Sequence, residues 1–400
     1  MNQLSDRINR LAESATLAMA RKSREMTEQG LQVISLSLGE PDFDTPDFVK
    51  EAAKQAIDDN FSKYPPVNGY LDLRKAIAHK FERDNGLHYT PEQIVVSTGA
   101  KQSIANLILS LINPGDEVII PAPYWVSYKA IINMAEGVAV EVPSSVEQDF
   151  KISKEQLEAS ITPKTRMLLF SSPCNPSGSV YSKADLRGFA DVLKKHPNII
   201  CVSDEIYEHI NFVGGHVSIG AFDDIFDQVV TVNGVSKAFA MTGWRIGYIG
   251  APAWIAKACS KMQGQSTSGA NTIAQKAAQA AVSADPASIH YMRDEFLKRR
   301  DMMLELLAEM PGVKTNLPEG AFYVFPDVSS FFGKTNGSVT INNAEDLSMY
   351  LLEEAHIALV TGDAFGAPAC MRISYAASEA QLRQAMSRMK TALSQLKERS

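Results

Sequence analysis

The clearest fold signal in the chain is RMLLFSSPCNPSGSVYSKADLRGFADVLKKHPNIICVSD, residues 166–204. Its two ends, RMLLF at 166–170 and NIICVSD at 198–204, are apolar runs of the length expected for strands buried on both faces of a sheet. Between them, residues 183–195 carry apolar side chains at helical spacing. A strand, a helix and a second strand in this order predict a right-handed βαβ unit in a parallel sheet.

The same alternation extends outward in both directions. A helix is expected at residues 101–112, and further strands at 95–97, 117–121, 138–142, 229–232 and 245–250. Strands that alternate with helices are typical of an α/β fold with a mostly parallel sheet covered on both faces. We therefore expect a large α/β domain over residues 48–290.

The pattern changes near residue 290, where a long charged helix at 290–310 resembles a connector. After it, short strands are expected at 321–325, 358–360 and 371–375, with helices at 343–355 and from Ser378 onward. This order predicts a smaller α+β domain over residues 291–400, which includes the connector helix. Residues 1–47 are expected to form an N-terminal arm and part of that smaller domain.

Composition limits the kinds of partner. The 400 residues include 39 Lys and Arg against 46 Asp and Glu, a net charge of −7, and contain no basic cluster. We therefore expect no nucleic-acid partner and no membrane partner. No apolar run is long enough for a membrane span, and charges interrupt the N-terminal segment, so no secretory signal is expected. Four scattered cysteines without a C-x-x-C pair indicate no metal site and a cytoplasmic location.

Common nucleotide and metal motifs are absent from the sequence. Gly333-Lys334-Thr335 resembles the end of a Walker A loop, but the opening glycine is replaced by Val328. GWRIGYIG at 243–250 does not match G-x-G-x-x-G, and neither H-E-x-x-H nor G-x-S-x-G occurs. The chemistry is therefore expected to come from other residues.

Polar side chains follow the expected strands. Asp204 ends one strand, Lys237 follows another, and Asn175 lies between two prolines after a third. Because open α/β sheets bind ligands at the carboxyl ends of their strands, we expect these side chains to meet. Ser236 and Arg245 add a hydroxyl and a forked cation suited to a phosphate, and the turn STGAKQS at 97–103 opens a helix, where anions bind.

An amine, a carboxylate, an amide and a phosphate site together fit pyridoxal 5'-phosphate (PLP). The lysine would form a covalent aldimine, and the carboxylate would keep the pyridine nitrogen protonated so that the ring accepts electrons. Each of these residues taken alone is more typical of a cap, a surface charge or a routine loop.

Nine motifs occur in the order found in a known family: SLGEPDFDTP, KYPPVNGYLDLR, STGAKQS, PAPYWVSY, SSPCNPSG, SDEIYEH, NGVSKAFAMTGWRIGY, EGAFYVF and MRISYA. By these motifs the chain resembles the fold-type I PLP-dependent aminotransferases of class I/II. It is most similar to the bacterial aspartate aminotransferases of the Ib subgroup. The resemblance covers nearly the full length and implies a mostly parallel seven-stranded sheet.

The resemblance implies a role for each matching residue. Lys237 would form the aldimine and carry the proton, and Asp204 would pair with the pyridinium nitrogen. Asn175 and Tyr207 would bind the 3'-oxygen, and Trp125 would stack on the ring. The phosphate would be held by Ser236, Arg245 and the backbone of Gly99, Ala100 and Lys101. Tyr64 would reach the phosphate of the neighbouring subunit, which implies a homodimer with shared active sites.

Substrate residues follow from the same resemblance. Arg372 would bind the α-carboxylate, with Gly39, Trp125 and Asn175 beside the substrate. Residues 264–278 contain no arginine for a second carboxylate, so we hypothesise that Lys101 binds it. The implied reaction is the reversible, ping-pong transfer of an amino group from L-aspartate to 2-oxoglutarate, which yields oxaloacetate and L-glutamate. The cofactor would alternate between PLP and pyridoxamine phosphate.

Two other activities stay open at this point. Prephenate aminotransferases and broad aromatic or dicarboxylate enzymes share the scaffold, and prephenate also carries two carboxylates. PLP-dependent C–S β-lyases of the same fold use the same lysine and aspartate. The resemblance does not set the preferred acceptor.

Overall fold

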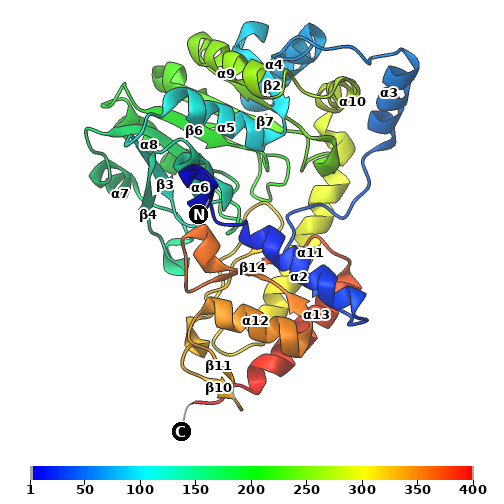
Figure 1. Cartoon of the computed structure of the whole chain (residues 1–400), viewed down its shortest axis with the longest axis vertical. Helices are drawn as coiled ribbons and strands as arrows, with labels where there is room; N and C mark the ends of the chain where they lie inside the picture. Colours follow the sequence, from blue (N-terminus) through cyan, green and yellow to red (C-terminus); the bar gives the residue numbers. More distant parts are fainter. Residues whose placement is uncertain (1–2, 338, 399–400) are drawn as a thin grey trace.

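A seven-stranded sheet forms the core of the larger part of the molecule (Figure 1). The computed structural model describes residues 3–337 and 339–398. In spatial order the strands are β2 (Ile94–Thr98), β8 (Ile246–Gly250), β7 (Val229–Gly234), β6 (Ile200–Asp204), β5 (Thr165–Ser171), β3 (Glu117–Pro121) and β4 (Val138–Val142). Of these seven, β8 alone runs antiparallel to its neighbours. The predicted mostly parallel α/β sheet is confirmed.

The sheet strands lie where the sequence predicts them, with small differences at their ends. The expected strand at 245–250 begins one residue later, at Ile246. Arg245 adopts φ +59°, in the left-handed region, and a residue in that conformation cannot continue a strand. The strand predicted at 229–232 extends through Gly234.

Alternate residues of the strands enter cores on opposite faces of the sheet. Leu169 of β5 packs with apolar residues of α5 (Ala100–Leu111), α6 (Ser127–Met134) and α9 (Ala253–Ser266). Leu168, one residue earlier, packs on the other face with α7 (Lys154–Ala159) and α8 (Lys183–Leu193). At the β2–β8 edge that second face is covered by α3 (Asp47–Asp58), α4 (Leu71–Asn85) and α10 (Thr272–Ser283). This two-sided burial explains why the strands are apolar throughout.

The C-terminal part forms a second core below the sheet in Figure 1. An antiparallel sheet in the order β13 (Val360–Thr361), β14 (Met371–Ser374) and β9 (Tyr323–Val324) packs with α12 (Ala344–Ala355) and α13 (Glu379–Ser394). Ser378 accepts the Gln381 N–H and forms a capping box, which fixes the start of α13. A short hairpin of β10 (Thr335–Asn336) and β11 (Val339–Thr340) lies at the far end.

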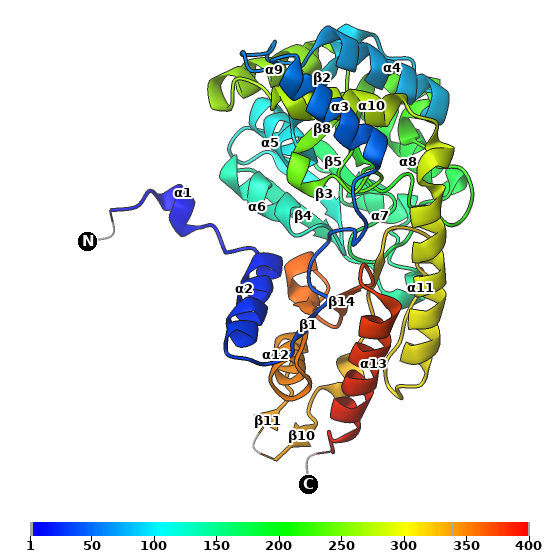
Figure 2. The same ribbon diagram turned by 90° about the vertical axis from the view of Figure 1, so that its right-hand side faces the viewer.

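The two parts share helix α11 (His290–Ala308), which runs along one side of the molecule in Figure 2. Met292 packs into a core of the large sheet, whereas Phe296 belongs to the C-terminal core. The helix was expected to end at Met310 but ends at Ala308. Pro311 explains the difference, since the residue before a proline disfavours the helical conformation.

The N-terminal segment joins the C-terminal part rather than the large sheet. Strand β1 (Ile34–Ser35) pairs in parallel with β12 (Ile357–Ala358). The preceding helix α2 (Ala15–Glu28) contributes Met19 to a small core with Ala358, and α1 (Asp6–Asn9) comes before it. The chain then crosses to the large sheet through residues 36–46, and in doing so passes the carboxyl edge of the strands.

Candidate active site

A cavity of about 340 Å³ lies at the carboxyl edge of the large sheet, between the two cores. Eleven residues singled out from the sequence line it: Gly39, Ala100, Lys101, Trp125, Asn175, Asp204, Tyr207, Ser236, Lys237, Arg245 and Arg372. They come from segments scattered over more than 330 positions. Strand register explains part of this convergence, because Ser171 of β5 lies beside Asp204 of β6, which lies beside Val232 of β7.

Asp204 is the last residue of β6 and is almost fully buried. Its Oδ2 accepts a hydrogen bond of 2.7 Å from the Tyr128 hydroxyl, and its Oδ1 accepts one of 3.3 Å from the Ile206 N–H. Burial nevertheless raises the pKa of Asp204 to about 6. A carboxylate in this state would be stabilised by a cation placed against it.

Lys237 lies three residues beyond the end of β7 and points into the cavity. Its Nζ donates a hydrogen bond of 2.6 Å to the Gly39 carbonyl. Burial lowers the pKa of Lys237 to about 8, and the nearby cations Arg372 and Arg245 act in the same direction. The amine is therefore close to the point where it can both give and take a proton near neutral pH.

An anion cradle forms where β2 turns into α5. Gly99 caps the helix with φ +80°, and a Cβ at this position would lie 2.4 Å from Nη2 of Arg245. Only a glycine therefore lets the guanidinium approach the free N–H groups at the start of α5. Ser236 and Lys101 line the same cavity as Arg245, and the group is suited to a phosphate.

Arg372 of β14 is buried beneath the cavity with only 2% of its surface exposed. Its Nη1 donates to Asn175 Oδ1 at 2.9 Å and its Nη2 donates to the Ser37 carbonyl, while Nε has no partner within the described residues. The ring of Tyr323 lies 4.6 Å from the guanidinium carbon. No carboxylate of the described chain forms an ion pair with Arg372, so its positive charge is available to an anionic ligand.

Lys101 and Trp125 also line the cavity and contact each other. Lys101 Nζ lies 5.1 Å from the centre of the Trp125 ring, a cation–π distance. Burial lowers the pKa of Lys101, and the positive charge of Arg245 adds to this effect. Like Arg372, the Lys101 amine forms no ion pair among the described residues, as the binding of a second substrate carboxylate would require.

Tyr207 and Gly39 complete the predicted set. The Tyr207 hydroxyl lies 2.7 Å from the Tyr323 hydroxyl, and both side chains are buried. A Cβ at Gly39 would lie 2.3 Å from the Tyr323 hydroxyl, so Gly39 must lack a side chain for this contact to exist. Gly99 supports the cavity through Arg245 without lining it.

Tyr64 lies away from the cavity and is 93% exposed. Tyr64 therefore does not line the cavity of its own chain. Its exposure is compatible with the expected contact to a second subunit, and that contact stays a prediction.

Several lining residues were missed by the sequence reasoning: Ser14, Thr16, Leu17, Ser171, Tyr128, Thr242 and Tyr323. Tyr128 and Tyr323 lie inside the motifs PAPYWVSY and EGAFYVF, which was the available signal. Nothing local marks Ser14, Thr16 and Leu17, because they reach the cavity only through the packing of α2 on the C-terminal core.

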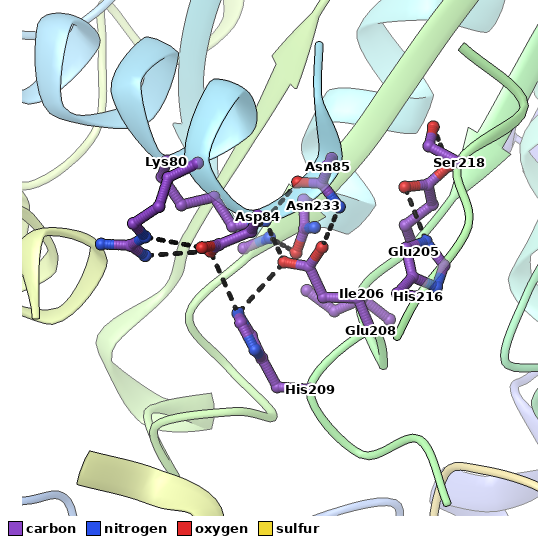
Figure 3. A network of polar contacts seen from close by, with 12 residues as sticks. Lys80, Asp84, Asn85, Glu205, Ile206, Glu208, His209, His216, Ser218 and Asn233 are labelled. Atoms are coloured by element: carbon purple, nitrogen blue, oxygen red, sulfur yellow. Dashed lines mark hydrogen bonds and ion pairs between the residues drawn. The ribbon is translucent and has the colours of Figure 1, made fainter. Parts of the chain in front are cut away.

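A buried polar network surrounds Glu205 and Glu208, which belong to the same segment as Asp204 and Tyr207 (Figure 3). Lys80 of α4 contacts Glu208, and Asn85 donates to the same carboxylate at 2.7 Å. Glu205 accepts a hydrogen bond of 2.7 Å from Ser218 and pairs with His216 at 2.8 Å. The segment 204–209 thus alternates: Asp204 and Tyr207 reach the cavity, whereas Glu205 and Glu208 anchor the segment on the other side. Glu205, Glu208 and His216 are close enough to ligate a metal, but Lys80 already contacts Glu208.

The residues present fit PLP. Buried Asp204 meets the requirement for a partner of a cationic ring nitrogen, the cradle around Gly99 and Arg245 suits a phosphate, and Lys237 offers an amine of lowered pKa between them. The residues therefore match three parts of the cofactor: its ring nitrogen, its phosphate and its aldehyde. A seven-stranded, mostly parallel sheet with these groups at its carboxyl edge defines the fold-type I class of PLP-dependent enzymes.

Comparison with known proteins identifies the family. The family described as "Aminotransferase class I and II" matches residues 32–389, and the chain belongs to it. The chain is therefore an aminotransferase, of a family that depends on PLP. The predicted family and fold class are confirmed.

Individual relatives are similar over nearly the whole chain. The chain is 46% identical to the aspartate/prephenate aminotransferase of Cereibacter sphaeroides, over 96% of this chain and 97% of that protein. It is also 46% identical to a bifunctional aspartate aminotransferase and glutamate/aspartate-prephenate aminotransferase of Petunia hybrida, over 98% of this chain and 83% of that one. The solved aspartate aminotransferase of Rhizobium meliloti superposes with a TM-score of 0.96 at 42% identity, over 99% of this chain and 100% of that chain.

Within the described residues, no helix is both long and apolar enough to cross a membrane.

Proposed function

We propose that this aminotransferase transfers the amino group reversibly between L-aspartate and 2-oxoglutarate, giving oxaloacetate and L-glutamate in two half-reactions. The observation that carries this proposal is the pair of cations, Arg372 and Lys101, that line one cavity without carboxylate partners in the described chain. A dicarboxylic amino acid supplies two anions to such a pair. The printed names of the relatives support the same substrate class.

The proposed residues divide into those that hold the cofactor and those that hold the substrate. Asp204 would pair with the ring nitrogen, Trp125 would lie against the ring, and Asn175 and Tyr207 would bind its 3'-oxygen. The backbone of Gly99, Ala100 and Lys101 would hold the phosphate together with Ser236 and Arg245. Arg372 would bind the α-carboxylate beside Gly39, and Lys101 would bind the distal carboxylate.

Lys237 would perform the acid–base work. When bound, PLP withdraws electrons from the substrate Cα, which makes the Cα proton acidic. The Nζ of Lys237, which would also provide the covalent attachment, would take that proton and deliver it to the neighbouring carbon of the cofactor. A pKa of about 8 suits both steps.

Prephenate is a second candidate for the amino-group acceptor. It also carries two carboxylates, so Arg372 and Lys101 would bind it in the same way. The names of the relatives from Cereibacter sphaeroides and Petunia hybrida include prephenate together with aspartate. The printed names of the relatives described above include aminotransferase activities and no β-lyase.

The larger organisation belongs to the same proposal. The chain would act as a cytoplasmic homodimer with shared active sites, to which Tyr64 would contribute from the neighbouring subunit. Residues 48–290 would form the large domain and 291–400 the small one, with residues 1–47 as an arm that also closes the site.

Absorbance during titration with amino acids tests the proposal. The purified protein with PLP should show a visible band of lysine-bound cofactor that aspartate bleaches and 2-oxoglutarate restores. Lys237→Ala should lose the band, whereas Lys195→Ala, an exposed residue just after α8, should keep it. A protein that shows no band after incubation with PLP would rule the proposal out.

Rates with two acceptors separate the two substrates. With aspartate as donor, kcat/KM is measured for 2-oxoglutarate and for prephenate. A much higher kcat/KM for prephenate would make prephenate, rather than 2-oxoglutarate, the assigned acceptor. Release of pyruvate from a thioether amino acid without any oxo acid would instead indicate a lyase.

A further inference from the structure

The carboxylate of Asp204 depends on one buried side chain that no motif role covers. Tyr128 is fully buried in α6, and its hydroxyl donates to Asp204 Oδ2 at 2.7 Å. The other hydrogen bond to this carboxylate comes from the Ile206 backbone N–H at 3.3 Å. Within the described chain, Tyr128 is therefore the only side chain that donates to Asp204.

The same tyrosine contacts the proposed ring-stacking residue. The rings of Tyr128 and Trp125 meet edge to face, with centroids 5.5 Å apart and an interplanar angle of 88°. One rigid side chain thus contacts both the carboxylate expected at the ring nitrogen and the indole expected at the ring face. This arrangement can fix the position of one relative to the other.

We propose that Tyr128 is a positioning residue, which keeps Asp204 ionised and oriented toward the ring nitrogen of PLP. The inference rests on the proposed function, because it assigns Asp204 to that nitrogen. A hydrogen bond to a buried carboxylate stabilises its charged form more than its neutral form.

The other groups near Asp204 do not replace this donor. The ionisable neighbours are Cys174, Glu205, Tyr207 and Lys237. Glu205 is turned away and held by His216 and Ser218 (Figure 3). Lys237 donates to the Gly39 carbonyl instead. Loss of the Tyr128 hydroxyl therefore leaves the Asp204 carboxylate with one backbone donor.

The dissociation constant of PLP, measured on the cofactor-free protein as a function of pH, tests the inference. On the acid side, affinity falls in two steps as Lys237 and then Asp204 take up a proton, and the midpoint of the lower step, near pH 6, reports the pKa of the Asp204 carboxyl. Tyr128→Phe is expected to move the midpoint upward by about one pH unit and to weaken binding about tenfold below it. The ionisations of PLP itself are the same in both proteins and cancel in the comparison.

A matched control is Tyr89→Phe. Tyr89 is also a buried tyrosine, and its hydroxyl lies 3.2 Å from that of Thr231, away from the cavity. The midpoint should stay at its wild-type position in this variant. Equal shifts in both variants, or no shift in a folded Tyr128→Phe that binds PLP, would overturn the inference while leaving the aminotransferase assignment intact.

A second variant covers the case in which Tyr128→Phe does not fold. Incorporation of 3-fluorotyrosine at position 128 keeps the shape and makes the hydroxyl a stronger donor. The acid midpoint should then move downward, and an unchanged or raised midpoint would contradict the inference. Failure of the wild-type protein to bind PLP would contradict the proposed function itself.

Discussion

Three ionisable groups line the cavity without an opposite charge bound to them: Asp204 and Arg372 are buried, and Lys237 is partly buried. Burial raises the pKa of Asp204 and lowers the pKa of Lys237 and of Arg372. Each shift moves the group toward its neutral form, which is the usual cost of leaving a charge unpaired in a dry site. A cofactor with a cationic ring nitrogen and a substrate with carboxylates would supply the missing partners, so the shifts fit a binding site better than a structural core.

The lowered pKa of Lys237 predicts how PLP attaches to the cofactor-free protein. Attachment needs the neutral amine, so its rate should rise with pH and level off above about 8. The negative charge of Glu40 raises the pKa of this amine, and Glu40→Gln should therefore move the midpoint to lower pH. Stopped-flow absorbance measures the rate. Glu51→Gln, an exposed change on α3, serves as the control, and an upward shift in Glu40→Gln would refute the prediction.

Lys101 predicts a selective loss of dicarboxylic substrates. Lys101→Ser should raise KM for aspartate by roughly 30-fold, the value of one charge-assisted hydrogen bond, and change KM for phenylalanine far less. Because Lys101 is also one of the residues proposed to hold the phosphate, PLP is kept saturating during the assay. Lys195→Ser is the matched surface control. Equal losses for both amino acids would remove Lys101 from substrate recognition.

At the scale of elements, the site depends on segments that end beside one another. The register of β5, β6 and β7 brings the residues that follow them to one edge. Behind that edge, the segment 204–209 is fastened to α4 by the pair Lys80–Glu208 (Figure 3). Although burial opposes ionisation, the positive charge of Lys80 holds the pKa of Glu208 well below its usual range.

This pair predicts a large loss of stability when one partner is removed. Lys80→Met leaves a buried carboxylate without its cation and should lower the free energy of unfolding by about 3–5 kcal/mol. The double variant Lys80→Met, Glu208→Gln should recover a substantial part of that loss. Urea unfolding of the cofactor-free protein provides the measurement. A double variant less stable than Lys80→Met would show that the unpaired Glu208 carboxylate is not the cause of the loss.

At the scale of the whole molecule, the N-terminal segment connects the two cores across the active site. Lys237 donates to Gly39, Thr242 to Glu40, and Thr45 to the Ala240 carbonyl. Arg299 of α11 adds an ion pair of 2.7 Å with Asp42. Residues 39–45 are thus fastened to the loop after β7 and to the shared helix, so a movement of the C-terminal part would be transmitted to the lysine.

A shared active site predicts complementation between two defective chains. Lys237→Ala should be inactive, and Tyr64→Ala should be weak when PLP is limiting. Mixed dimers from an equal mixture would contain one intact site each, and about a quarter of the wild-type activity should return, because half of the dimers are mixed. Activity equal to the average of the two separate variants would show that Tyr64 does not act across subunits.

The elements and most of the lining residues could be predicted from the sequence because their signals are local. Apolar runs marked β5 and β6, and Asp204 and Lys237 stand directly after strands. Two elements differ from their predicted ends for local stereochemical reasons. Strand β8 begins after Arg245, which has a left-handed backbone conformation, and helix α11 ends shortly before Pro311. Ser14 and Thr16 were not predicted, since their place in the cavity depends on how α2 packs rather than on their own segment. Tyr128 was missed although it lies inside the motif PAPYWVSY.

By itself, the sequence determined the alternation of strands and helices, the family, and which residues carry reactive groups, because periodicity and motifs are properties of neighbouring positions. Only the tertiary structure decided which of these groups meet. Arg372 contacts Ser37 across 335 positions, Lys237 reaches Gly39 across 198, and Asp204 receives its hydrogen bond from Tyr128. The tertiary structure also decided the pKa values of Arg372, Lys237 and Asp204, because desolvation and the field of neighbouring charges arise only when the chain packs.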